Sequence, residues 1–252
     1  MGRGELVRSL GEAGWQTCSY DTIARAPKLL KRFPVIFGGF NRFLPNRRAH
    51  FDFFSQLSPN QVYIHPSSRA VYKPACELVE ESPFVSQPSK YARQKMIEEE
   101  LLDRYPARML VLRLPNILSA EVDFSQNKFF SIFCRNAFRL ATVRMSGSPS
   151  SIKDFLCVED LSFVIEKLVT HDAGQGVYNV SYGNGGTSME EFVEFAAQNI
   201  GPLKVVYEKG EMEEFSLDNT KLISVIKNEK ELRKRFVPSL HKIYQQLKLR
   251  KT

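Results

Sequence analysis

The sequence is poor in the residues that build disulfide frameworks and metal sites. Its 252 residues include four cysteines and four histidines. No two cysteines form a Cys-x-x-Cys pair, and the histidines show no metal-ligand spacing. We therefore expect no bound metal and no disulfide scaffold, with reduced thiols in a cytosol-like compartment.

Long apolar runs are also missing. No stretch reaches about 18 consecutive apolar residues, and the N-terminus shows no apolar signal region. These absences predict a soluble, cytoplasmic protein without a membrane span.

Positive charge is in excess, since the formal net charge is +7 at pH 7. That excess favours anionic partners in general, such as nucleotide phosphates, nucleic acid or acidic lipid, without choosing among them.

What is present alternates between helical and strand-like stretches, which predicts an α/β fold with a largely parallel sheet. We expect strands over residues 16–20, 34–37, 61–65, 108–114, 153–158 and 177–180. We expect helices over residues 5–13, 23–32, 50–57, 89–105, 127–140 and 159–170, and a mostly helical tail from Lys221. The run Thr187-Ser-Met-Glu190 is typical of a capping box and predicts a helix that ends before Gly201.

The expected helix over 89–105 has the strongest amphipathic pattern in the chain. Its apolar stripe is expected to hold Met96, Ile97, Leu101, Leu102 and Tyr105. On its solvent side we expect Glu98, Glu99 and Asp103. This helix also carries the residue pair that points most directly to chemistry.

Tyr91 and Lys95 lie four residues apart on this helix, so their Cβ atoms share one face at about 6 Å. A tyrosine with the ordinary pKa of about 10 exchanges protons poorly at neutral pH. The ammonium of Lys95 favours the phenolate and prepares Tyr91 for acid/base work on a carbonyl or hydroxyl. Ser68, just past the 61–65 strand, is well placed to hold the substrate oxygen. Most Tyr-x-x-x-Lys pairs are exposed residues without a catalytic role. Whether this pair is catalytic therefore depends on the residues around it.

Those neighbours follow in a definite order: Ser67-Ser68 after a strand, then Tyr91 and Lys95, then Pro115-Asn116 after the next strand. The order resembles the extended short-chain dehydrogenases, the NAD-dependent epimerase/dehydratase family of nucleotide-sugar enzymes. Segments 153–161, 178–180 and 217–222 also have counterparts there, so the likeness spans roughly residues 14–222.

The resemblance implies a Rossmann-like doubly wound parallel sheet with a smaller C-terminal α/β substrate domain. Residues 1–116 with about 152–182 would form the dinucleotide-binding domain, and residues 117–151 with 183–252 the substrate-binding domain. Site roles also follow from the resemblance. Tyr91 would be the acid/base, Ser68 would polarise the substrate oxygen, and Lys95 would tune Tyr91 and hold the nicotinamide ribose.

Further residues would complete the two sites. Ser67 is the alternative to Ser68, and Asn116 and Lys153 would contact the substrate. Lys153 replaces an arginine of the family, which keeps the charge but loses bidentate phosphate recognition. Pro115 would lie on the nicotinamide side of the cofactor.

The resemblance implies NAD rather than NADP as the cofactor, because Asp21 falls where an acidic residue would bond the adenosine ribose. Gly2 and Gly4 are candidate remnants of the glycine turn that meets the pyrophosphate, and Gly38 falls in the adenosine-side turn. The strand before the glycine turn has no counterpart in this sequence. Three interpretations stay open: an incomplete chain, a rearranged sheet, or a homologue that no longer binds a dinucleotide.

Three functions follow from these patterns. The first is an NAD-dependent epimerase, dehydratase or reductase of a nucleotide-linked sugar. The second is a non-catalytic binding or scaffolding homologue, and the third is a nucleic-acid-binding relative, which basic runs suggest but no motif supports. The resemblance also implies a possible homodimer, because two helices near these positions often form the dimer in that family, and an apolar face on 49–57 and 89–105 is the candidate surface.

Overall fold

The computed structural model describes residues 11, 14, 16, 31–38, 55–105, 107–125, 128–183, 185–210, 213–227 and 229–249. The expected cofactor-binding residues Gly2, Gly4 and Asp21 lie outside the described residues, as do most of the elements expected before residue 33. None of the helices in the described ranges has the length and apolar character that a membrane crossing requires.

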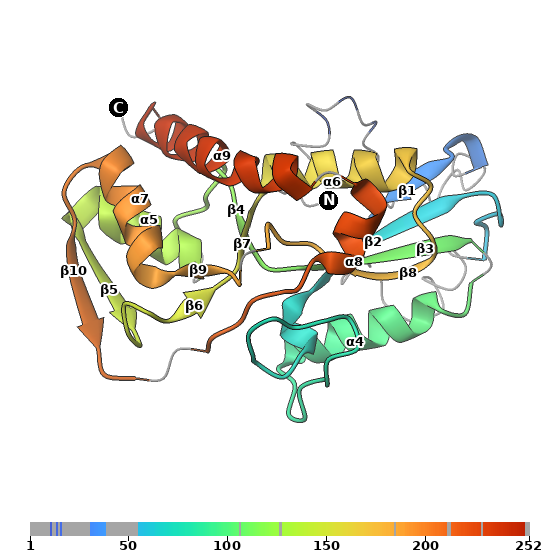
Figure 1. Ribbon diagram of the computed structural model, residues 1–252, viewed down its shortest axis with the longest axis horizontal. Helices are drawn as coiled ribbons and strands as arrows, with labels where there is room; N and C mark the ends of the chain where they lie inside the picture. The colour runs from blue at the N-terminus through green and yellow to red at the C-terminus, as the bar shows by residue number, and fades with distance from the viewer. Residues whose placement is uncertain are drawn as a thin grey trace.

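A four-stranded parallel sheet forms the centre of one half of the molecule (Figure 1). Its strands lie side by side in the order β1 (Val35–Phe37), β2 (Val62–Ser68), β3 (Arg108–Leu114) and β8 (Gly176–Asn179). Six of the seven residues of β3 are buried, as a strand covered on both faces requires. The predicted α/β class with a parallel sheet is confirmed.

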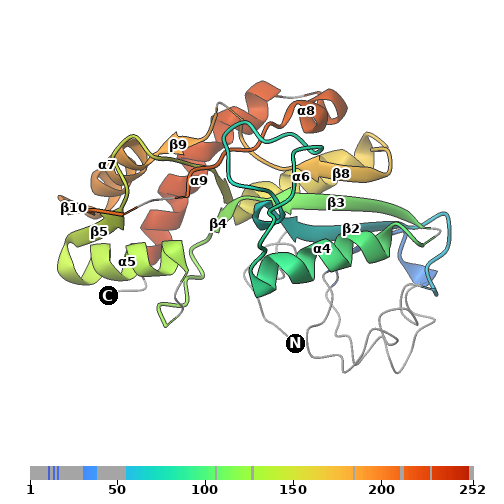
Figure 2. The same cartoon turned by 90° about the horizontal axis from the view of Figure 1, so that it is seen from below.

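Helices cover the two faces of this sheet, and the alternation of side chains along β3 decides which residues meet which layer. Met109 and Val111 pack on the side of α4 (Lys90–Leu102), together with Leu102. Leu110 and Leu112 pack on the opposite side, against α6 (Val158–Thr170) and α8 (Thr220–Ile226). Figure 2 shows α4 running along β2 and β3.

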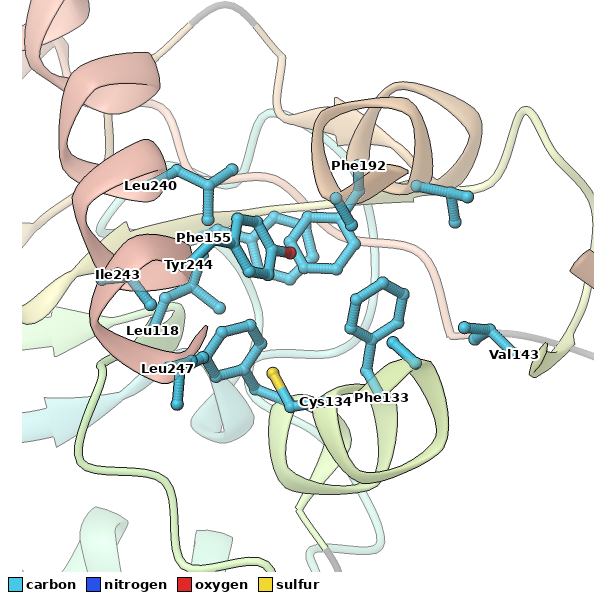
Figure 3. Close-up of a cluster of buried hydrophobic side chains, with 14 of the residues drawn as sticks. Leu118, Phe133, Cys134, Val143, Phe155, Phe192, Leu240, Ile243, Tyr244 and Leu247 are labelled. Atoms are coloured by element: carbon cyan, nitrogen blue, oxygen red, sulfur yellow. The ribbon is translucent and has the colours of Figure 1, made fainter. Parts of the chain in front are cut away.

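The other half of the molecule has its own core. It contains α5 (Phe129–Leu140), β5 (Thr142–Ser146), α7 (Met189–Ile200), β10 (Lys204–Glu208) and the long α9 (Glu229–Leu249). Aromatic rings from separate elements meet there, as Figure 3 shows for Phe133, Phe155, Phe192 and Tyr244. The Phe155 and Phe192 ring centroids are 4.5 Å apart, close enough for favourable stacking. Helix α9 packs against both α6 and α7 and so joins the two halves.

The prediction of one strand over 153–158 is wrong, because the chain changes partners at Asp154. β6 (Ile152–Lys153) pairs antiparallel with β9 (Thr187–Ser188), whereas β7 (Phe155–Cys157) pairs parallel with β4 (Asn116–Leu118). The buried carboxylate of Asp154 accepts hydrogen bonds from the backbone N–H groups of Leu217 and Phe155. The carboxylate at the break between β6 and β7 thus satisfies the N–H of the first residue of β7 and that of Leu217 in a neighbouring segment.

The capping box before α7 lies one residue further along the chain than predicted. Ser188 is the N-cap, its hydroxyl accepts from the Glu191 N–H, and the Glu191 carboxylate accepts from the Ser188 N–H. Thr187 and Glu190 have the same Ser/Thr-x-x-Glu spacing, so the pattern alone permits both registers.

Candidate active site

A pocket of about 480 Å³ opens where β2 and β3 end and where α4 and α5 begin. Its size is typical of small-molecule sites. In a parallel sheet this carboxyl edge is where ligands commonly bind. The lining residues are Ser68, Arg69, Ala70, Tyr91, Pro115, Asn116, Ile117, Val122, Lys128, Phe129, Phe130 and Ser131.

The two adjacent serines at the end of β2 face opposite ways. Ser68 lines the pocket, and its Oγ accepts a hydrogen bond of 3.2 Å from the Ala70 N–H, which caps the short helix η2 (Arg69–Val71). Its hydroxyl proton is therefore left to donate. Ser67 points away from the pocket, and its hydroxyl donates to the buried Glu99 carboxylate. The strand alternation thus presents Ser68, and not Ser67, to a ligand in the pocket.

Tyr91 and Lys95 differ in where their polar ends lie. Tyr91, in the first turn of α4, lines the pocket with 55% of its surface exposed. Lys95 is not among the residues that line the pocket. It donates to the Pro66 carbonyl at 2.9 Å and to the Glu98 carboxylate at 2.8 Å. Its ammonium is therefore bonded to groups outside the pocket lining.

Three further expected residues lie at the carboxyl edge. Pro115 and Asn116 follow β3 and line the pocket, and the Asn116 N–H is tied to the Asp154 carbonyl at 3.2 Å. Gly38 follows β1, where its N–H donates to the Ile64 carbonyl and its own carbonyl accepts from the Tyr63 hydroxyl. Gly38 is therefore fixed beside β2 but lies outside the pocket lining.

Lys153 also lies outside the pocket lining. Its ammonium donates to the Glu213 carbonyl at 2.8 Å, and it lies 5.4 Å from the Phe215 ring centroid. Burial lowers the pKa of Lys153, and the nearby charge of Arg69 lowers it further. The structure thus brings together Ser68, Tyr91, Pro115 and Asn116 in one pocket. It places Ser67, Lys95, Gly38 and Lys153 outside the pocket lining.

The expectation that Glu98 and Glu99 face solvent is wrong, since both are buried under the sheet. Glu99 pairs with Arg113 of β3, whose Nη2 lies 2.6 Å from Glu99 Oε2. Arg113 also donates to the Tyr72 hydroxyl at 2.7 Å and to the Glu80 carbonyl at 2.8 Å. Both carboxylates can be buried on this face of α4 because each contacts a cation, Arg113 for Glu99 and Lys95 for Glu98.

Glu98 belongs to a second group of polar side chains, in which Glu98 and His65 are buried, Lys95 is half-buried and Gln94 is exposed. Its Oε2 lies 2.8 Å from the Lys95 ammonium and 3.2 Å from His65 Nε2, while its Oε1 accepts from Gln94 at 2.9 Å. Burial alone would raise the pKa of Glu98, but the hydrogen bond from His65 and the charge of Lys95 lower it to about 2. Burial lowers the pKa of His65, which keeps the imidazole neutral at physiological pH.

Two charged residues of the pocket lining, Arg69 and Lys128, were not predicted as site residues from the sequence. Arg69 directly follows the two serines and pairs with Glu213 at 2.8 Å, and Lys128 precedes the first turn of α5. No acidic side chain is among the described lining residues. Nor do the described residues contain a group of three or more His, Cys, Asp and Glu side chains suited to a metal ion.

Comparison with known proteins agrees with this arrangement. The model of the NAD dependent epimerase/dehydratase family matches residues 52–181, more than half of the chain. The chain belongs to that family. No match was found among curated proteins.

Solved structures similar to this chain include three sugar-nucleotide 4-epimerases. The UDP-N-acetylglucosamine 4-epimerase from Methanobrevibacter ruminantium, in complex with UDP-N-acetylmuramic acid, is 20% identical with a TM-score of 0.70, over 89% of this chain and 79% of that one. The Thermus thermophilus UDP-glucose 4-epimerase, in complex with NAD, is 17% identical with a TM-score of 0.68, over 91% and 82%.

The third is the UDP-glucuronic acid 4-epimerase from Bacillus cereus in complex with NAD. It is 15% identical with a TM-score of 0.66, over 88% of this chain and 74% of that one. At these identities the likeness shows the fold, and it confirms the predicted Rossmann-like architecture.

Proposed function

We propose that the protein is an NAD-dependent enzyme that acts on a nucleotide-linked sugar, as an epimerase, dehydratase or reductase, with Tyr91 as its acid/base. The observation that carries the proposal is the pocket that gathers Ser68, Tyr91 and Asn116 at the carboxyl edge of the sheet. Membership of the NAD dependent epimerase/dehydratase family supports it. So does the likeness to enzymes solved with NAD or with a UDP-sugar compound.

The residues at this edge fit the nicotinamide end of the cofactor. Pro115, Ile117 and Phe129 give the pocket an apolar wall, while Ser68 and Tyr91 add hydroxyls. Such a mixture, mostly apolar with a few polar groups, is typical of a cofactor site. Pro115 and Ile117 would back the ring, and Lys95 would bind the ribose next to it. When bound, the nicotinamide accepts and returns a hydride.

The residues of the chain would carry the proton and hold the sugar. Ser68 donates its hydroxyl to the reacting oxygen of the substrate, and Asn116 binds a neighbouring polar group. Tyr91 takes the proton from that oxygen when the carbon is oxidised and returns it on reduction. Because more than half of the Tyr91 surface is exposed, the bound sugar itself must shield the phenol from water.

The charge of the pocket supports a phosphate-bearing substrate. Arg69 and Lys128 line it, and an anion placed there meets two cations and no described acidic lining residue. Glu213 partly compensates the charge of Arg69. Lys128 is therefore the cation that we expect to interact more strongly with a diphosphate.

Lys128→Gln is therefore expected to weaken the binding of UDP-glucose about 10-fold, the loss of one charge-assisted phosphate contact. Calorimetric titration of the full chain with UDP-glucose, and with UDP alone, gives the dissociation constants. Lys90→Gln removes the same charge from the start of α4, outside the pocket lining, and should leave both constants unchanged. Equal affinities for the two variants would contradict a phosphate site in this pocket.

A further inference from the structure

One cation of the pocket is already paired with a carboxylate from a distant part of the chain. Arg69 directly follows Ser68 and lines the pocket, and its Nη1 lies 2.8 Å from Glu213 Oε2. We propose that Glu213 is an internal counterion of Arg69 that an anionic group of the substrate displaces on binding. The inference rests on the proposed function and adds a specificity-determining contact to it. A phosphate or a carboxylate can replace Glu213 at Arg69, whereas a neutral group cannot.

The guanidinium of Arg69 is supported by a contact other than its ion pair. Its Cζ lies 3.8 Å from the centroid of the Phe215 ring, so the ring covers one face of the guanidinium. Phe215 is itself buried, and its N–H donates to the Ile152 carbonyl at 3.1 Å. The N–H donors of a guanidinium lie along its edge, and contact through the face leaves that edge for an anion. Arg69 should therefore keep its orientation when Glu213 moves away.

The backbone of Glu213 is anchored, whereas its carboxylate is open to solvent. The Glu213 carbonyl accepts a hydrogen bond of 2.8 Å from the Lys153 ammonium. The Glu213 side chain is 46% exposed. A carboxylate that water already reaches can leave its partner without becoming a buried, unpaired charge, and for this reason such ion pairs are weak. Rotation of the Glu213 side chain is therefore enough to free Arg69, with the backbone left in place.

The charges around the ion pair favour an incoming anion. Burial lowers the pKa of Lys153 and the charge of Arg69 lowers it further, while Glu213 and Glu214 act in the opposite direction. The two cations are thus close enough to repel each other, and Lys128 adds a third positive charge in the pocket lining. A phosphate can bind a guanidinium through two parallel N–H···O bonds. Such a group should compete well with the single carboxylate of Glu213.

Glu213→Gln tests the proposal, because it removes the competing charge and nearly keeps the size of the side chain. We expect this variant to bind inorganic pyrophosphate about 3- to 5-fold more tightly than the wild type, since a partly exposed ion pair no longer has to be broken. Calorimetric titration of the full chain gives the dissociation constants. Glu208→Gln is the matched control. It breaks a 3.0 Å ion pair with Arg144, its side chain is 49% exposed, and it lies outside the pocket lining, so the affinity should not change.

A double variant tests whether the effect passes through Arg69. Arg69→Gln should weaken the binding of pyrophosphate, and the addition of Glu213→Gln to that variant should then give no gain. A gain that persisted without Arg69 would show that Glu213 acts only as a general negative charge, and this result would overturn the proposal. An equal gain in Glu208→Gln would overturn it for the same reason.

Two nucleotide sugars identify the group that displaces Glu213. A similar gain for UDP-glucose, UDP-glucuronic acid and pyrophosphate would assign the displacement to a phosphate. A gain confined to UDP-glucuronic acid would assign it to a carboxylate on the sugar. Equal affinities of the wild type and Glu213→Gln for all three probes would overturn this inference and leave the proposed function intact. The absence of binding of any probe to either protein would contradict both.

Discussion

Tyr91→Phe is expected to lower turnover by about 10³-fold, because the loss of a positioned acid/base typically costs 10²- to 10⁴-fold. The change deletes one oxygen from a side chain that is 55% exposed, so the packing of α4 on the sheet should be retained. The thermal midpoint should therefore match the wild type. The binding of NAD should also stay within a few-fold, since the role proposed for the phenol is on the sugar oxygen and not on the cofactor.

The measurement is the conversion of a UDP-sugar by the full chain with NAD, followed by NMR of the sugar protons. Tyr178→Phe is the matched control: its hydroxyl is bonded to the Gly174 carbonyl on the approach to β8, away from the pocket. That control should keep full turnover while losing a little stability, about 1 kcal/mol for one hydrogen bond. If Tyr91→Phe retained more than about a tenth of the wild-type rate, the acid/base role of Tyr91 would be wrong.

Arg113→Met is expected to destabilise the protein by about 3–5 kcal/mol, since it leaves the Glu99 carboxylate buried without its cation. Arg113 is almost wholly buried and donates to Glu99, to the Tyr72 hydroxyl and to the Glu80 carbonyl. Its loss therefore leaves several buried polar groups without a hydrogen-bond partner at once. Urea unfolding followed by circular dichroism gives the change in the free energy of unfolding.

Two further variants separate the charge effect from the loss of packing. Glu99→Leu with Arg113→Met removes both charges and should recover most of the stability that Arg113→Met loses. Arg104→Met breaks an ion pair with Glu100 that is more than half exposed on both sides, and should cost less than about 0.5 kcal/mol. An Arg113→Met protein within about 1 kcal/mol of the wild type would show that the buried network does not support the fold.

The regular elements followed closely from local pattern. The apolar run Arg-Met-Leu-Val-Leu-Arg-Leu predicted β3 with its observed bounds, and Ser89 caps α4 through a 3.1 Å bond to the Ala92 N–H. β2 continues beyond the predicted end at His65, through Pro66 to Ser68. Proline usually ends a strand, but in β2 the chain stays in register with β3 along its whole length.

The strands β5 and β10 were not expected from the sequence. They pair with each other in parallel across a long separation, Thr142 with Lys204 at one end and Ser146 with Glu208 at the other. Each strand is short, and the alternation of burial along β10 is weak. Such pairing depends on tertiary context, which a single sequence does not reveal.

The site was predictable in its residue types and less so in their environment. Order along the chain pointed to Ser68, Tyr91 and Asn116, which the pocket brings together from β2, α4 and β4. The burial of Glu98 and Glu99 was missed because a hydrophobicity pattern places carboxylates on the wet face of a helix. Only the fold reveals that His65 and Arg113, on neighbouring strands of the sheet, lie against them.

The central claim is that this chain binds NAD and uses it on a nucleotide-linked sugar. Calorimetric titration of the full chain with NAD tests it most directly, with a second titration in the presence of UDP-glucose. We predict saturable binding at submillimolar NAD, and growth of NADH absorbance when the sugar is added. The absence of saturable binding up to millimolar NAD would contradict the account, and would favour a homologue that has kept Ser68, Tyr91 and Lys95 without their redox chemistry.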